Sequence, residues 1–136
     1  MNPITVLLAE DHAMVREGMR ALLNLEDDVK VVGEAENGHQ AVAFATKLCP
    51  DVVLMDVSMP LLDGLEATRQ ILETTPSTKV LMLSARDDKA SIKEAMAVGA
   101  AGYLIKEAAA RVLPKAIREA HEGKCFLSPD RFQHLE

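Results

Sequence analysis

Residues 52–56 read Val-Val-Leu-Met-Asp, an apolar run of four residues that ends in a carboxylate. Residues 4–11 read Ile-Thr-Val-Leu-Leu-Ala-Glu-Asp and end in two more. Short runs of this composition are typical of strands that a parallel sheet buries on both faces. The carboxyl ends of parallel strands lie at one edge of the sheet, where open α/β folds bind their ligands. The acidic residues therefore predict a polar site at that edge.

Three further runs extend the pattern, and Ser84 and Lys106 follow two of them directly. We expect strands at Ile4–Ala9, Lys30–Ala35, Val52–Met55, Val80–Leu83 and Tyr103–Ile105. Apolar stripes of helical spacing alternate with these strands: Val15, Met19, Leu22 and Leu23; Ala41, Phe44, Ala45 and Leu48; Leu65, Thr68, Ile71 and Leu72; Ile92, Ala95, Met96 and Gly99; and Val112, Leu113, Ala116, Ile117 and Ala120. The alternation predicts an α/β fold, a doubly wound sheet of five parallel strands built from five βα units.

Composition favours one domain without a nucleic-acid-binding surface of its own. The 136 residues are 49% apolar, and the net charge is -6, so no overall positive field attracts the phosphates of DNA. Cys49 and Cys125 lack metal-ligand spacing, and no signal peptide or membrane-spanning run is visible, which favours a reducing cytoplasm and no membrane association. We expect the domain at residues 1–122 and a linker at residues 123–136, since Gly123 would stop the last helix.

The predicted edge brings together the carboxylates of Glu10, Asp11 and Asp56. Two like charges ~4 Å apart repel by roughly 4 kcal/mol at an effective dielectric near 20, and Lys106 alone cannot neutralise three. Such a site holds a proton or a cation. Oxygen ligands of this kind suit Mg2+, whereas zinc is disfavoured because His12, which we expect to be solvated, is the one histidine nearby.

A carboxylate can attack phosphorus and form an acyl phosphate, and Asp56 is the candidate nucleophile. Phosphoryl transfer depends on alignment and on positive charge around the equatorial oxygens more than on acid–base groups. Mg2+ and Lys106 would supply that charge, and the Ser84 hydroxyl would supply a hydrogen bond.

These motifs resemble the receiver domain of bacterial two-component response regulators over about residues 3–122. The resemblance rests on Glu10-Asp11, Asp56-Val57-Ser58-Met59-Pro60, Asp63-Gly64, Ser84-Ala85 and the run from Gly99 to Lys106, in the order of that family. It implies a CheY-like, flavodoxin-like fold with strand order 2-1-3-4-5. It also implies a Mg2+-dependent switch that a sensor histidine kinase phosphorylates.

The resemblance assigns a role to each matching residue. Asp56 would be the phosphoacceptor, Glu10, Asp11, Asp56 and the backbone carbonyl of Ser58 the Mg2+ ligands, Ser84 and Lys106 the phosphoryl contacts, and Ser84 with Tyr103 the switch. Ser58 and Arg86 stand two positions beyond site residues and would border the path of water to phosphorus. We therefore expect both to tune the lifetime of the phosphorylated state, Arg86 more strongly.

The ending from Ala116 to Pro129 resembles the receiver end of NarL/FixJ-type transcriptional regulators, in which a helix-turn-helix DNA-binding domain follows. We therefore expect a receiver that controls transcription through a domain absent from this chain. Phosphorylation would favour a homodimer, first through the fourth helix, fifth strand and fifth helix. A stand-alone CheY-like receiver is the alternative, and Leu135-Glu136 could be a cloning scar.

Other functions fit less well. An aspartyl-phosphate phosphatase of the haloacid dehalogenase type needs a second Asp two residues after the first, where this chain has Ser58, so we expect no turnover of external substrates. A dinucleotide site needs a glycine-rich turn, but Glu10-Asp11-His12-Ala13 follows the first strand. Singly, Asp11 could be a helix cap, Asp56 a turn residue and Lys106 a surface lysine. A degenerate receiver that only binds proteins would not need all of these residues together.

Overall fold

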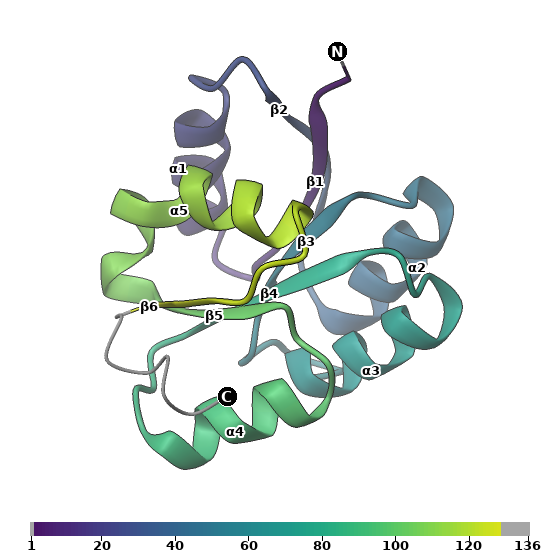
Figure 1. Cartoon of the computed structure of the whole chain (residues 1–136). Coiled ribbons are helices and arrows are strands. Elements are labelled where there is room, and N and C mark those ends of the chain that lie inside the picture. Colours follow the sequence, from purple (N-terminus) through teal and green to yellow (C-terminus); the bar gives the residue numbers. More distant parts are fainter. Residues whose placement is uncertain (1, 129–136) are drawn as a thin grey trace.

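The computed structural model of the chain describes residues 2–128 (Figure 1). Six strands are β1 (Ile4–Ala9), β2 (Val29–Ala35), β3 (Val52–Asp56), β4 (Lys79–Ser84), β5 (Gly102–Ile105) and β6 (Phe126–Ser128). Five helices are α1 (Ala13–Leu23), α2 (Gly38–Leu48), α3 (Gly64–Thr74), α4 (Lys89–Ala97) and α5 (Lys106–His121). The elements alternate as β and α along the chain, so the predicted α/β class is confirmed.

All neighbouring strands of the sheet are parallel, in the order β2-β1-β3-β4-β5-β6. The predicted order of the first five strands is confirmed, and a sixth strand is added at one edge. Register decides which residues meet at the carboxyl edge. Ala9 pairs with Met55, so Glu10 and Asp56 follow at the same level. Ser84 pairs with Ile105, so Lys106 comes one step further on.

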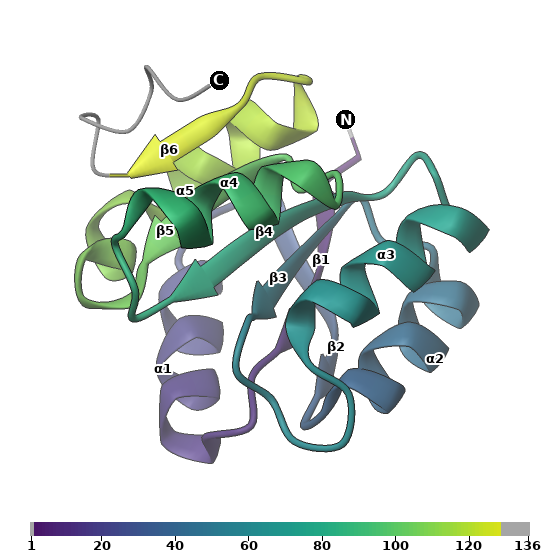
Figure 2. The ribbon, with the colours of Figure 1, turned by 90° about the horizontal axis from the view of Figure 1, so that it is seen from below.

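Helices cover both faces of the sheet (Figures 1 and 2). Because side chains alternate along a strand, Leu7 and Val53 join the core under α2, α3 and α4, whereas Leu8 and Leu54 join the core under α1 and α5. Apolar surface removed from water stabilises the fold by roughly 25 cal/mol per Å2. Val15, expected on the buried stripe of α1, is 45% exposed because it borders a groove between α1 and α5.

Side-chain caps begin three of the five helices. Asn37, Asp63 and Asp88 each accept a hydrogen bond from the backbone N–H three residues later, which satisfies a donor of the first helical turn. His12 is the residue directly before α1, and its side chain does not cap the helix. Asp11 stands one residue earlier and is therefore not the helix cap that its position in the sequence allows. Within residues 2–128, no helix combines the length and apolar content needed to cross a membrane.

The end of one helix differs from the prediction, and the expected linker contains a strand. Gly99 was assigned to the fourth helical stripe, but α4 ends at Ala97 and Gly99 lies beyond it with φ 103°, a left-handed conformation that favours glycine. Within the expected linker, residues 126–128 pair with β5 as β6. Phe126 and Leu127 are buried in opposite cores. A strand of three residues is too short to produce a periodic signal. Residues 129–136, including Leu135-Glu136, lie outside the described part.

Replacing Gly102 by Ala should destabilise the fold, because an added Cβ would lie 2.4 Å from the backbone oxygen of Phe126. We expect a loss of about 1–3 kcal/mol of unfolding free energy from this overpacking. Gly18→Ala is the matched control, since a Cβ in α1 meets nothing within 4 Å and alanine favours a helix by about 0.5–1 kcal/mol. Urea unfolding of both variants measures the difference. An unchanged midpoint for Gly102→Ala would show that β6 does not hold β5 closely.

Candidate functional site

The three predicted carboxylates meet where β1 and β3 end. Glu10 and Asp56 are buried and Asp11 is partly exposed. One ligand atom from each of these residues, together with one from the His12 ring, lies within 4.8 Å of the others. The register of β1 on β3 causes this closeness, because it sets Glu10 beside Asp56. Three acidic side chains therefore share one small volume with little water around them.

Lys106, the first residue of α5, brings positive charge to this cluster. Its Nζ lies 3.0 Å from Asp56 Oδ2 and 3.2 Å from Glu10 Oε1. These two carboxylate oxygens and Asp11 Oδ1 are buried, and apart from the Lys106 ammonium they have no hydrogen-bond partner. An ammonium held between two carboxylates is not the freely solvated surface lysine that its position alone could suggest. One positive charge thus faces three acidic groups whose oxygens remain open to a further partner.

The remaining oxygens of the two buried carboxylates are bound by nearby backbone. Asp56 Oδ1 accepts a hydrogen bond of 3.1 Å from the Ser58 N–H, and Glu10 Oε2 accepts one of 3.0 Å from the His12 N–H. His12 Nδ1 also lies 2.9 Å from Glu10 Oε2. The His12 side chain is two-thirds exposed, as expected, but its ring is held against the acidic cluster. Each carboxylate is therefore fixed through one oxygen and leaves the other toward Lys106.

Burial and charge separate the pKa values of the two buried acids. Burial raises the pKa of Asp56 to about 6, and the neighbouring Glu10 charge acts in the same direction against Lys106 and the Ser58 N–H. Burial also acts to raise the pKa of Glu10, but the hydrogen bonds from His12 and the attraction of Lys106 outweigh it and hold the pKa below its usual value. Near pH 6 the site therefore carries an ionised Glu10 beside an Asp56 that is partly protonated.

Ser84, Arg86 and Tyr103 form a second group beside the carboxylates. Ser84 Oγ accepts a hydrogen bond of 3.0 Å from the Arg86 N–H, and the Tyr103 hydroxyl donates one of 2.8 Å to the Arg86 carbonyl. Tyr103 is 1% exposed, so its ring is already turned inward. Burial raises the pKa of Tyr103, while a hydrogen bond with Ser84 acts to lower it. Both expected switch residues therefore contact the backbone of Arg86, Ser84 through its N–H and Tyr103 through its carbonyl.

The Arg86 guanidinium is not among the groups at the carboxylates. Its Nε donates to Asp88 Oδ1 at 3.1 Å, and the side chain is 73% exposed. Asp88 in turn caps α4, so the arginine points toward that helix. A cavity of about 380 Å3 lies there, bordered by Ser84, Arg86 and Tyr103. The loop after β4 thus links the site edge to the start of α4.

One residue beside the site, Arg16, is not part of any of the motifs that predicted the site. Arg16, in α1, donates a hydrogen bond of 2.8 Å from Nη1 to the Glu10 carbonyl, and its Nε binds Glu34 Oε1 at 2.9 Å. Its acceptors come from the end of β1 and from β2, so only the fold brings the three residues together. A basic residue one turn into the helix that follows an acidic pair is the signal that could have suggested it.

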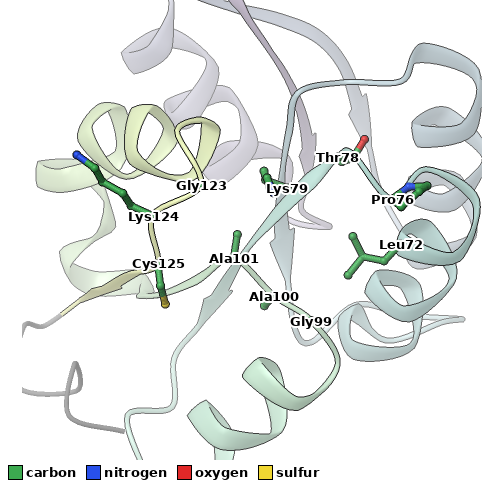
Figure 3. A pocket seen from close by; sticks show the side chains of 10 residues that line it. All are labelled: Leu72, Pro76, Thr78, Lys79, Gly99, Ala100, Ala101, Gly123, Lys124 and Cys125. Carbon is green, nitrogen blue, oxygen red and sulfur yellow. The ribbon is translucent and has the colours of Figure 1, made fainter. Parts of the chain in front are cut away.

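A pocket of about 340 Å3 at the opposite edge of the sheet contains none of the predicted site residues (Figure 3). It is lined where β4, β5 and β6 begin, by residues that include Lys79, Ala101 and Cys125. This pocket lies at the amino ends of the strands and the carboxylate cluster at their carboxyl ends, on opposite edges of the sheet. The chemistry that the motifs indicate is therefore confined to the carboxyl edge.

The arrangement of Glu10, Asp11, Asp56 and Lys106 suits phosphoryl transfer to a carboxylate. Comparison with known proteins identifies the family of the chain. Residues 6–118 match the response regulator receiver domain. The chain belongs to this family. Its sheet order is that of the CheY-like receiver fold, with a minor sixth strand. Receiver domains are signalling proteins, and they generally bind Mg2+ in an acidic pocket such as the one at Asp56.

The relatives and solved structures that the receiver resembles include transcriptional regulatory proteins and response regulators of the LuxR and NarL types. It is 38% identical to the transcriptional regulatory protein DegU of Brevibacillus brevis and 42% identical to the response regulator UvrY of Escherichia coli K12, over 94% and 97% of this chain. It covers 54% and 61% of those proteins. A LuxR-family response regulator of Aurantimonas matches with a TM-score of 0.92 at 31% identity, covering 98% of this chain and 96% of that one. The receiver domain of the putative response regulator NarL of Mycobacterium tuberculosis matches with a TM-score of 0.87 at 34% identity. The match covers 91% of this chain and 100% of that one.

Replacing Asp56 by Asn should stabilise the metal-free receiver in a pH-dependent way. Because the pKa of Asp56 is raised to about 6, the folded chain binds more protons than the unfolded chain between about pH 4 and 6, and stability falls as pH rises through this window. Asparagine removes that loss. We expect the advantage of the variant, measured by urea unfolding in the presence of a chelator, to grow by about 2 kcal/mol from pH 4 to pH 7. A constant difference would mean that Asp56 titrates normally.

Proposed function

We propose that Asp56 accepts a phosphoryl group from a sensor histidine kinase and that the receiver thereby switches an output. The observation that carries the proposal is the buried Asp56 Oδ2, which lies 3.0 Å from Lys106 Nζ and has no other partner. A nucleophile needs an oxygen that is free yet aligned, and Asp56 Oδ1 is already bound by the Ser58 N–H. Asp56 Oδ2 is therefore the proposed attacking atom.

The transfer would form a bond between Asp56 Oδ2 and phosphorus while the P–N bond of a phosphohistidine breaks, and the imidazole leaves with the bonding electrons. Lys106 would stabilise the charge on the equatorial oxygens, and the Ser84 hydroxyl would donate to one of them. Glu10, Asp11, Asp56 and the Ser58 carbonyl would hold Mg2+, which supplies further positive charge to the transferring group. The unpartnered oxygens of Glu10 and Asp11 fit such a cation.

Acetyl phosphate with Mg2+ should add one phosphoryl group to the chain, and Asp56→Asn should abolish the addition, because an amide is not a nucleophile toward phosphorus. Intact-mass spectrometry measures both. Asp27→Asn is the control, since Asp27 is an exposed carboxylate in the turn after α1. Modification of the Asp56→Asn chain to the parent's extent would contradict the assignment of the phosphoacceptor.

The output that we propose is transcription, through a helix-turn-helix DNA-binding domain of the kind expected for this subfamily. The relatives that share 38–42% identity are named transcriptional or response regulators, and this chain spans only 54–61% of their length. On this proposal the receiver acts in the cytoplasm and does not turn over external substrates. Ser58 stands where the alternative phosphatase would need its second Asp.

We also propose a phosphorylation-dependent homodimer. The face first expected for it includes the edge of β5, but β6 pairs with that edge. The contact would therefore involve α4 and α5 with β6 between them, rather than direct pairing of β5. One solved relative at 30% identity is described as two RcsB dimers bound to two parallel DNAs. That description supports the dimer for the relative and motivates the proposal for this chain.

Lifetime control by Ser58 and Arg86 remains a proposal. Ser58 is exposed beside Asp56, where it is too short to block water. To cover a phosphoryl group, the Arg86 guanidinium would have to leave Asp88. Loss of that exposed pair would change stability little, because water screens it. The cost of moving Arg86 toward the site is therefore small.

Tyr103 emission should change when a phosphoryl mimic such as beryllofluoride binds with Mg2+. The Ser84 hydroxyl would turn from the Arg86 N–H and Tyr103 toward the mimic, and the environment of the Tyr103 hydroxyl would change with it. Tyr103 is the sole tyrosine and the chain has no tryptophan, so fluorescence reports this site alone. Ser84→Ala should remove the response. Identical emission and ring NMR shifts with and without bound mimic would rule out the coupling.

A further inference from the structure

The backbone of Glu10 is fixed on both sides of its Cα by groups outside its own turn. Its N–H donates a hydrogen bond of 3.0 Å to the Ala35 carbonyl of β2, and its carbonyl accepts one of 2.8 Å from Arg16 Nη1. Two fixed peptide planes determine the direction of the Cα–Cβ bond. The peptide that Arg16 holds also contains the Asp11 nitrogen, so the same contact determines where Asp11 begins.

Arg16 is itself held in place by Glu34 of β2. Arg16 Nε donates to Glu34 Oε1 at 2.9 Å, and the Arg16 side chain is only 13% exposed. Glu34 also accepts a hydrogen bond of 2.7 Å from Arg20, whose side chain is 45% exposed and for which the described contacts show no bond to Glu10. A guanidinium has several donors in one rigid plane and can bridge a carboxylate and a carbonyl at once.

The turn from Glu10 to His12 carries two acidic side chains next to the third, Asp56. Mutual repulsion favours any motion of this turn that moves Glu10 and Asp11 away from Asp56. Arg16 opposes that motion, because it ties the Glu10 carbonyl to the neighbouring strand through Glu34. The acidic pair is thereby kept at the distance from Asp56 that a shared cation requires.

We propose that Arg16, held by Glu34, is a positioning residue that sets Glu10 and Asp11 for divalent-cation binding beside Asp56. This role rests on the proposed phosphoryl-transfer function and extends it to a residue outside the carboxylate cluster. Arg16 acts through the backbone of Glu10 and touches neither the cation nor the phosphoryl group. Groups that orient metal ligands in this indirect way typically change metal affinity by 10–100-fold when they are replaced.

The test is a MgCl2 titration without phosphodonor, followed by the amide NMR shifts of Asp11, His12 and Ser58. Arg16→Ala should weaken Mg2+ binding at least tenfold relative to the parent chain. Arg20→Ala removes the other arginine that binds Glu34, and the Mg2+ affinity of this variant should stay within twofold of the parent's. Arg16→Lys should recover only part of the affinity, because an ammonium lacks the guanidinium's rigid pair of donors. Thermal unfolding of each variant separates this effect from a general loss of stability.

Glu34→Gln provides a second route if Arg16→Ala does not fold. It leaves Arg16 in place but removes the nearer of its two acidic partners, the other being Glu36 at 3.8 Å, and Mg2+ affinity should fall severalfold. The positioning role would be overturned if folded Arg16→Ala binds Mg2+ with an affinity within twofold of the parent's. Where Arg16→Ala does not fold, the same result in Glu34→Gln would overturn it. An equal loss of Mg2+ affinity in Arg20→Ala and Arg16→Ala would overturn it as well. Acetyl phosphate treatment of the parent chain tests the proposed function separately. A parent that binds Mg2+ but is not modified at Asp56 would contradict that function and leave the positioning role intact.

Discussion

Three carboxylates and one ammonium meet at the carboxyl edge of the sheet, and this imbalance of charge is the constraint on which the site depends. Two buried like charges ~4 Å apart cost roughly 4 kcal/mol at an effective dielectric near 20. Lys106 contacts one oxygen of Glu10 and one of Asp56, and neither of these two oxygens has another partner. The cluster meets the remaining cost by protonation of Asp56 or by a cation. Of these two responses, only the cation leaves Asp56 ionised, as the proposed phosphoryl transfer requires.

The fold causes this imbalance of charge, because strands and helices fix the position of each charged side chain. Parallel register sets Glu10 beside Asp56, and α5 begins with Lys106 directly after β5. The sixth strand holds the other edge of β5, where Tyr103 pairs with Leu127. A change at the proposed phosphoryl site that moves β5 would therefore also act on β6.

Local pattern was sufficient to predict the part of the fold that the site uses. Each strand that ends in a site residue is buried on both faces, so its apolar run and its terminal polar residue were visible together, as in residues 52–56. Contacts between distant segments were not visible. Arg16 meets Glu34 across 18 positions, and β6 is too short for a periodic signal. The inward ring of Tyr103 depends on packing against the loop at Arg86, which sequence spacing does not encode.

The most direct test of the charge imbalance is a pH titration of the Asp56 carboxyl carbon by NMR, with and without Mg2+, assigned through Asp56→Asn. Without Mg2+, burial and the neighbouring Glu10 should place the midpoint near pH 6. Saturating Mg2+ should lower the midpoint by more than about one unit, because a bound cation favours the ionised carboxylate. A midpoint near the ordinary value of 3.8 in both titrations, or one that Mg2+ leaves unchanged, would contradict a shared cation site at Asp56.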